Sequence, residues 1–275
     1  MQKIVINKHR NDEVFMKNLI KSPLWLSGLI LSLGISAIFV MSAQVFIGPA
    51  LVPGLMAGGL IVLAIGSVKI VGESLKISEI IGILILILGI ALLGISELSI
   101  DLIEFNLVDT VFIVRTVIFT ASLWILALLF IHIQKNSERF RSILFAIASG
   151  YMFALSSVWI GLLMGVIGGV FGGSAVWGEL ILFIVASIIL VVSNMWGVKW
   201  IQDALKYGQA SNLIPIQQVP IQITPMIAYY LVFLLIPPSI FSIFFSIIGV
   251  ALIIWSSFLL GQRQAELEKI RKEEI

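Results

Sequence analysis

The chain contains no cysteine and only two histidines among its 275 residues. The lack of cysteine excludes disulfides, thiol catalysis and iron–sulfur clusters, and His9 and His132 stand too far apart to form a zinc motif. Charge is scarce as well, because 12% of residues are charged, about half the share in a soluble domain. The polar stretches at the two ends are too short to fold alone. We therefore expect one membrane domain rather than a soluble enzyme with an anchor.

Long apolar runs fill most of the sequence, in which 60% of residues are hydrophobic. A helix needs about 20 apolar residues to cross a hydrocarbon core about 30 Å thick, and eight segments approach or exceed that length. The predicted fold is therefore an all-α, polytopic membrane protein surrounded by the lipid bilayer. The predicted spans are Leu24–Phe46, Ala50–Val71, Ile77–Ile95, Val108–Ile133, Ile143–Ile167, Leu180–Val198, Leu213–Ile236 and Ser239–Leu260.

The distribution of Lys and Arg supports this number of spans. When the segments are threaded up and down, 16 of the 17 basic residues fall on one face, and the remaining one, Arg115, lies inside the fourth span. Short loops on the cytoplasmic side retain Lys and Arg. We therefore predict a cell-membrane protein with both termini in the cytoplasm.

Two stretches of the chain resemble later stretches about 160 residues away. Ala50–Leu55 aligns with Asn212–Gln217, and Leu88–Leu93 aligns with Ile248–Ile253. The aligned helices run in opposite directions through the membrane, which is the inverted arrangement of many secondary transporters. The predicted organisation is a basic cytoplasmic segment (1–23), a first repeat of three helices (24–95), an acidic outer loop (96–107), a second repeat of five helices (108–260) and a charged cytoplasmic tail (261–275).

Short motifs at the helix ends resemble a known family. They are Lys21–Trp25, Leu51–Pro53 and Gly72-Glu73 in the first half, and Asp203–Tyr207 and Ser211–Ile216 in the second. Together they resemble the drug/metabolite transporter (EamA-like) superfamily, and most closely its NIPA-like magnesium-transporter branch. The resemblance implies secondary transport of a small solute, with Mg²⁺ as the substrate of that branch. The family has one N-terminal helix more, or two by a five-plus-five plan, so we expect either an eight-helix form or a natural start that lies upstream.

Prolines and amides mark the predicted substrate site. Pro53 and Pro215 lie at matching positions of the repeat, a few residues inside their spans. Each proline removes a backbone hydrogen-bond donor, and an unpaired backbone carbonyl is tolerated in a bilayer only where it lines a cavity. Proline in the first turn of a helix is, however, also an ordinary structural feature. Gln218 and Gln222 stand four apart on one helix face. Such amides either line a cavity or form hydrogen bonds between helices.

Three further polar residues within the spans are weaker candidates. Gln44 and Asn194 are typical of hydrogen bonds between helices, and Arg115 either serves transport or extends to the interface towards Asp109. We expect the second and seventh spans to face each other near the midplane, with the two glutamines in the gap. No carboxylate pair, Ser/His arrangement or phosphate loop lies within the spans, so we predict no enzyme, no cofactor and no nucleic-acid partner.

The loop after the third span carries Glu97, Asp101 and Glu104, whose spacing predicts one acidic face of a short surface helix. With Asp109 and Glu179, the outer face has five acids and no Lys or Arg. An acidic mouth raises the local cation concentration, and Mg²⁺ prefers carboxylate and water oxygens, although an ordinary solvated surface has the same pattern. The metal ligands, if any, stay unknown.

The sequence thus predicts a secondary transporter of a small solute, with a divalent cation such as Mg²⁺ as one substrate class. Two alternatives stay open. One is an exporter of an uncharged or zwitterionic metabolite, which the amides suit equally well. The other is a non-transporting membrane subunit or lipid-handling partner, which the scarcity of charge within the spans favours. The glycine pairs Gly54–Gly58 and Gly161–Gly165 predict close helix packing, within one chain or in a homodimer.

Overall fold

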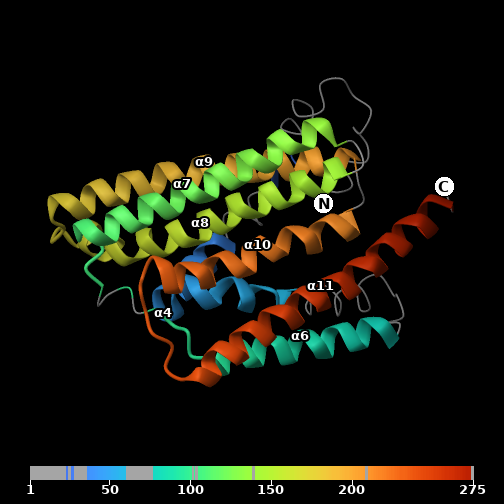
Figure 1. Cartoon of the computed structure of the whole chain (residues 1–275), viewed down its shortest axis with the longest axis horizontal. Coiled ribbons are helices and arrows are strands. Elements are labelled where there is room, and N and C mark those ends of the chain that lie inside the picture. The colour runs from blue at the N-terminus through green and yellow to red at the C-terminus, as the bar shows by residue number, and fades with distance from the viewer. Residues whose placement is uncertain are drawn as a thin grey trace.

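Helices are the only regular elements in the described part of the chain, which we analyse as a computed structural model (Figure 1). The structure describes residues 23, 26–27, 36–59, 77–100, 102, 105–137, 140–207 and 210–273. The all-helical prediction is confirmed for these residues. The elements are α4 (Ser36–Met56), α6 (Ile77–Ile95), α7 (Thr110–Ile133), the 3₁₀ helix η3 (Gln134–Asn136), α8 (Arg141–Gly172), α9 (Trp177–Tyr207), α10 (Ala210–Leu231) and α11 (Ile240–Glu273).

Within these described ranges, five helices are long and apolar enough to cross a membrane, judged by length and composition. They are Phe39–Met56 of α4, the whole of α7, α8 and α9, and Ile240–Leu259 of α11. α6 has a shorter apolar part, Ile80–Ile95, and α10 contains three prolines. The predicted polytopic membrane fold is confirmed at this level. Each predicted span from the third onward coincides with one helix.

The first two predicted spans meet inside α4, which is broken at Gly48. This glycine has φ 72° and ψ 173°, a conformation almost restricted to glycine, and the two parts of α4 diverge there (Figure 1). We call residues 36–47 the first arm and residues 49–56 the second arm. The break coincides with the predicted boundary, but it is not a solvated loop, because Gly48 is buried. The remainder of both spans and the basic segment 1–22 lie outside the described residues, apart from 26–27.

The predicted acidic surface helix after α6 is wrong. Residues 97–100 are not helical, and side chains are buried at every second position, which is the pattern of an extended chain. The buried residues are Leu98, Ile100 and Leu102. A Cβ at Gly48 would lie 2.7 Å from the Ile100 carbonyl oxygen. The segment therefore covers the break in α4, and its remaining acids, Asp101 and Glu104, lie outside the described residues.

The helices from α6 to α11 alternate in direction, so their ends gather on two sides of the bundle (Figure 1). One side, here called the basic end, carries Lys135, Arg141, Lys199 and Lys206. The opposite, acidic end carries Glu97, Asp109 and Glu179. For these described residues the separation of charge agrees with the predicted threading. The assignment of the basic end to the cytoplasm stays a prediction.

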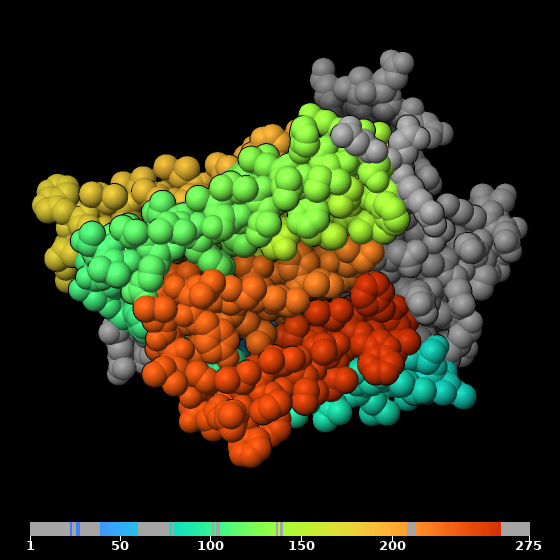
Figure 2. Space-filling model, in the orientation of Figure 1, coloured from blue at the N-terminus to red at the C-terminus, as the bar shows by residue number. Residues whose placement is uncertain are grey.

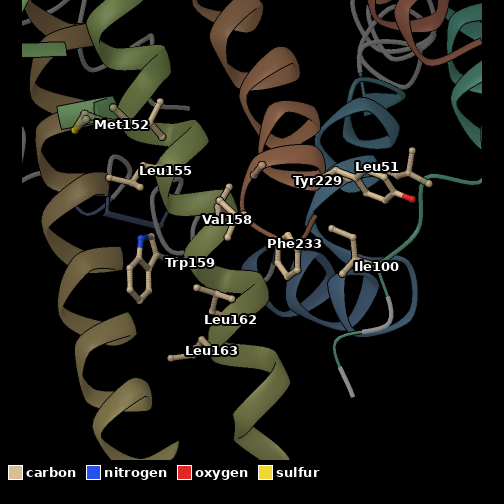
Figure 3. Close-up of a cluster of buried hydrophobic side chains, with 14 of the residues drawn as sticks. Leu51, Ile100, Met152, Leu155, Val158, Trp159, Leu162, Leu163, Tyr229 and Phe233 are labelled. Atoms are coloured by element: carbon tan, nitrogen blue, oxygen red, sulfur yellow. The ribbon is translucent and has the colours of Figure 1, made fainter. Parts of the chain in front are cut away.

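The central helix is α8, which packs against α4, α7, α9 and α10. Half of its span is buried, compared with 17% for α7 and 22% for α9, and α7 accordingly forms part of the outer surface (Figure 2). In Figure 3, Leu155 and Trp159 of α8 lie on the side of α9, whereas Tyr229 of α10 and Phe233, two residues after the end of α10, lie on the other side of α8. α8 thus separates two parts of the molecule, α7 and α9 on one side and α4 and α10 on the other.

α6 and α11 form an antiparallel pair that crosses at two glycines. A Cβ on Gly89 would lie 2.9 Å from the Gly249 carbonyl oxygen, and a Cβ on Gly249 would lie 2.9 Å from the Gly89 carbonyl oxygen. The neighbours are reciprocal too, because Gly89 approaches Ile253 while Gly249 approaches Leu93. In the sequence repeat, Gly89 aligns with Gly249 and Leu93 aligns with Ile253. Aligned residues therefore exchange the same contacts across this crossing.

Candidate substrate site

Gln222, near the middle of α10, lies against the second arm of α4. Its side-chain nitrogen donates to the Pro53 carbonyl oxygen at 3.0 Å and to Gln218 Oε1 at 3.4 Å. Gln222 is only 2% exposed, and Gln218 is half-buried. Gln222 thus contacts two other predicted site residues, Gln218 on its own helix and Pro53 of α4.

The Pro53 carbonyl is free to accept this bond because α4 ends one turn later. In a continuing α-helix the Ala57 amide would donate to Pro53. Here the Ala57 nitrogen donates instead to the Gly54 carbonyl oxygen at 3.1 Å, the tighter bonding of a 3₁₀ turn. A buried carbonyl without a partner costs about 1–3 kcal/mol. The Gln222 amide satisfies it.

Gly54 allows the second arm to approach this amide closely. A Cβ at Gly54 would overlap the Leu93 side chain of α6 and would lie 3.5 Å from Gln222 Oε1. Gly161 and Gly165 of α8 likewise pack against α4 and against the segment that follows α6. The predicted close packing at these glycines therefore occurs within one chain, so they give no support to a homodimer, which stays a prediction.

All three prolines of α10 are buried. Each lacks the N–H that would bond the carbonyl four residues earlier, so α10 has three carbonyls without their usual intrahelical donor. Pro215 was a predicted site residue, but Pro220 was not. Pro220 packs directly on α8, where a Cβ at Gly150 would overlap the proline ring. The repeat gave no signal for it, because the position aligned with Pro220 is Gly58.

Three serines of α8 accept amides from three other helices. The bonds run from Asn194 Nδ2 of α9 to Ser156 Oγ (2.7 Å), from Gln217 Nε2 of α10 to Ser149 Oγ (2.8 Å), and from Gln44 Nε2 of α4 to Ser157 Oγ (3.3 Å). Asn194 and Gln44 therefore take the hydrogen-bonding role that was one of their two predicted roles. Gln217 was not a candidate, yet it has the same role.

Gln44 also keeps one unpaired polar atom. Its Oε1 has no hydrogen-bond partner in the described structure, and the residue is 0% exposed. Buried amide oxygens nearly always have a partner. This acceptor lies four residues before the break at Gly48.

Arg115 lies in the second turn of α7, away from the Gln222–Pro53 contact. Its Nε donates to the Val111 carbonyl oxygen at 3.3 Å, and its Nη1 is buried without a partner. The predicted extension towards Asp109 is not observed, because Asp109 Oδ2 accepts the backbone amides of Val111 and Phe112. Asp109 thus serves as the N-cap of α7.

The described residues contain no group of three or more His, Asp or Glu side chains that could hold a metal ion. The oxygens around the Gln222–Pro53 contact belong to neutral amides and to the backbone. Mg²⁺ gives up its water reluctantly and usually keeps several water ligands. Neutral oxygens can therefore hold a hydrated cation or a polar solute weakly, as a transport path requires.

Comparison with known families identifies a match over most of the chain. The model of the family described as "Magnesium transporter NIPA" matches residues 7–266 of the chain. The comparisons with curated proteins and with solved structures gave no significant match.

Proposed function

The chain belongs to the NIPA family of magnesium transporters, and we propose that it carries Mg²⁺ across a membrane as a secondary transporter. The family match supports membrane transport as the function. The substrate and the residues that contact it are our proposal.

The observation that supports a path between α4 and α10 is the bond from Gln222 to the Pro53 carbonyl oxygen. It joins α4, which is broken at Gly48, to α10, whose three prolines each remove one bond of the helix. Interrupted helices offer free carbonyl oxygens at membrane depth, where regular helices offer none. Gln218 and Gln222 add two amide oxygens. A hydrated Mg²⁺ would pass along these oxygens.

We further propose eight spans arranged as an inverted repeat, with both termini in the cytoplasm. The reciprocal contacts of Gly89 and Gly249 support a local two-fold relation between α6 and α11. In transporters with inverted repeats, one repeat rocks against the other around a fixed site.

Uptake of Mg²⁺ into liposomes that contain the purified protein tests this proposal. The double variant Gln218→Ala/Gln222→Ala should transport about tenfold more slowly, which corresponds to the loss of about 1.4 kcal/mol of interaction. Gln217→Ala is the matched control, because it removes a buried amide of the same helix that bonds Ser149 instead. Flux equal to that of empty liposomes would contradict Mg²⁺ transport. Unchanged flux in the double variant would contradict the site.

An exporter of a neutral or zwitterionic metabolite is the second candidate. The lack of a carboxylate cluster among the described residues favours it, because neutral amides recognise such solutes as readily as they do a hydrated cation. The same liposomes should be tested with a panel of amino acids and polyols. Saturable uptake of one of these solutes, without Mg²⁺ flux, would favour this candidate.

A further inference from the structure

A pocket of about 420 Å³ lies at the basic end, on the side of α8 that carries α7 and α9. Its volume falls within the range of about 300–1,000 Å³ that is usual for small-molecule sites. Phe145 of α8 contributes to its lining, and Trp124 of α7 meets Trp200 of α9 inside it, with ring centroids 6.5 Å apart. The other apolar lining residues are Leu128, Ile131 and Trp196.

The pocket lies apart from the proposed transport path. Its residues come from η3 and from α7, α8 and α9, and α4 and α10 contribute none. Leu128 is 52% exposed and Trp196 is 38% exposed, so the pocket opens on the outer surface of helices that face the lipid. Tryptophan is enriched where hydrocarbon meets the headgroups, and Trp196 lies three residues before the basic Lys199.

Lys199 is the charged group of this pocket without a countercharge. Its Nζ lies 4.4 Å from the centroid of the Trp196 ring, and no carboxylate of the described residues forms an ion pair with it. The pocket's carboxylate, Asp203, is already bonded to Lys206 at 2.8 Å. The Gln134 oxygen is also occupied, because it accepts Arg141 Nε at 3.0 Å. The pocket therefore offers one free cation above an aromatic and aliphatic slot.

We propose that this pocket holds a phospholipid, with its phosphate on the Lys199 ammonium and one acyl chain against Trp124, Leu128 and Trp200. Basic pockets between transmembrane helices are suited to lipid phosphates. The phosphate supplies the charge that Lys199 lacks, and the apolar walls exclude a ligand that is polar throughout. The cation–π contact with Trp196 holds the ammonium at the mouth of the pocket.

Native mass spectrometry of the detergent-purified full chain with added phosphatidylglycerol tests the phosphate contact. Lys199→Gln should weaken the one-to-one lipid adduct about tenfold, because a charge-assisted hydrogen bond is lost. Lys199→Arg should retain it, since arginine stacks on tryptophan and binds phosphate. Lys135→Gln is the matched control, with the same change of charge at the same end but outside the pocket lining. Equal losses in Lys199→Gln and Lys135→Gln, or no loss in either, would overturn the proposal.

A second measurement locates the acyl chain. Phosphatidylglycerol with brominated acyl chains should quench tryptophan fluorescence at one lipid per protein, because Trp124, Trp196 and Trp200 line the pocket. Trp124→Phe/Trp200→Phe should lose most of the quenching and still bind the lipid. Glycerol phosphate and inorganic phosphate should not displace it at equal concentration. Displacement by either, or quenching unchanged in the double variant, would exclude a lipid seated in this slot.

Discussion

The polar side chains on the two sides of α8 find their hydrogen-bond partners differently. On one side, α7 and α9 are uninterrupted, and several of their hydroxyls bond carbonyls of their own helix, as Thr116 does to Phe112 and Ser187 to Phe183. Asn194 of α9 and Thr120 of α7 are the residues here that also bond side chains of α8. On the other side, α4 and α10 contain a glycine break and prolines, and their amides bond distant parts of the chain, as Gln222 does to Pro53.

This difference has a mechanical consequence. A bond within one helix is unaffected when that helix moves as a unit, so α7 and α9 can serve as a fixed frame. A bond between two helices must break when they separate, so the Gln222–Pro53 bond reports the relative position of α4 and α10. The region with interrupted helices is therefore where conformational change would be concentrated, and where substitutions should be most costly.

The largest effect is expected for Gly48→Ala, at the break in α4. Alanine rarely adopts φ 72° with ψ 173°, and its Cβ would lie 2.7 Å from the Ile100 carbonyl oxygen. We expect a loss of about 3 kcal/mol of stability, from backbone strain and overpacking together. Thermal unfolding in detergent, with the yield of monodisperse protein, measures it.

Gly173→Ala provides the control on the regular side of the molecule. Gly173 ends α8 with φ 73° and ψ 12°, and a Cβ there would meet nothing within 4 Å. Only the left-handed conformation is then penalised, at about 1–2 kcal/mol. Equal melting temperatures for the two variants would show that the contact with Ile100 does not constrain the break.

An intermediate effect is expected where α10 packs on α8. Gly150→Ala should destabilise the protein by about 1–3 kcal/mol, because its Cβ would overlap the Pro220 ring. Gly168→Ala lies on the same helix with no atom within 4 Å of the added Cβ, so it should stabilise the helix by up to about 1 kcal/mol. The two melting temperatures should therefore shift in opposite directions. Shifts in the same direction would mean that α8 and α10 are not tightly packed at this point.

The sequence predicted the positions of the later helices well. Long apolar runs bounded by charged residues located the six helices from α6 to α11, because span length and loop charge are both constrained by the bilayer. The break at Gly48 falls between the first two predicted spans, but a buried break inside one helix was not foreseen. Gly48 is buried because the segment around Ile100 covers it. That segment follows the alternation of its apolar residues, which is typical of an extended chain, and not the acidic spacing that predicted a helix.

The candidate site was partly predictable for a similar reason. The repeat placed Pro53 opposite the helix that carries Gln222, and the structure contains that contact. The contacts of Gln217 and Pro220 depend on which face of α10 packs on α8. Prolines can change which residues lie on that face, and no spacing rule in the sequence specifies those residues.

The smallest effect on stability, and the sharpest test of the comparison, is expected for Gln44→Leu. The substitution removes a 3.3 Å bond to Ser157, but it also removes a buried oxygen that has no partner. A hydrogen bond between membrane helices contributes about 0.6 kcal/mol on average, and burying an unpaired polar atom costs about 1–3 kcal/mol. The melting temperature should therefore stay unchanged or rise slightly. Mg²⁺ flux in liposomes should fall if the Gln44 oxygen serves transport, because residues kept for function are often retained at a cost in stability.

Asn194→Leu is the matched control, since its amide makes two bonds, at 2.7 Å and 2.8 Å, and its loss should lower stability. A destabilised Gln44→Leu protein with normal flux would mean that Gln44 serves only to hold α4 on α8.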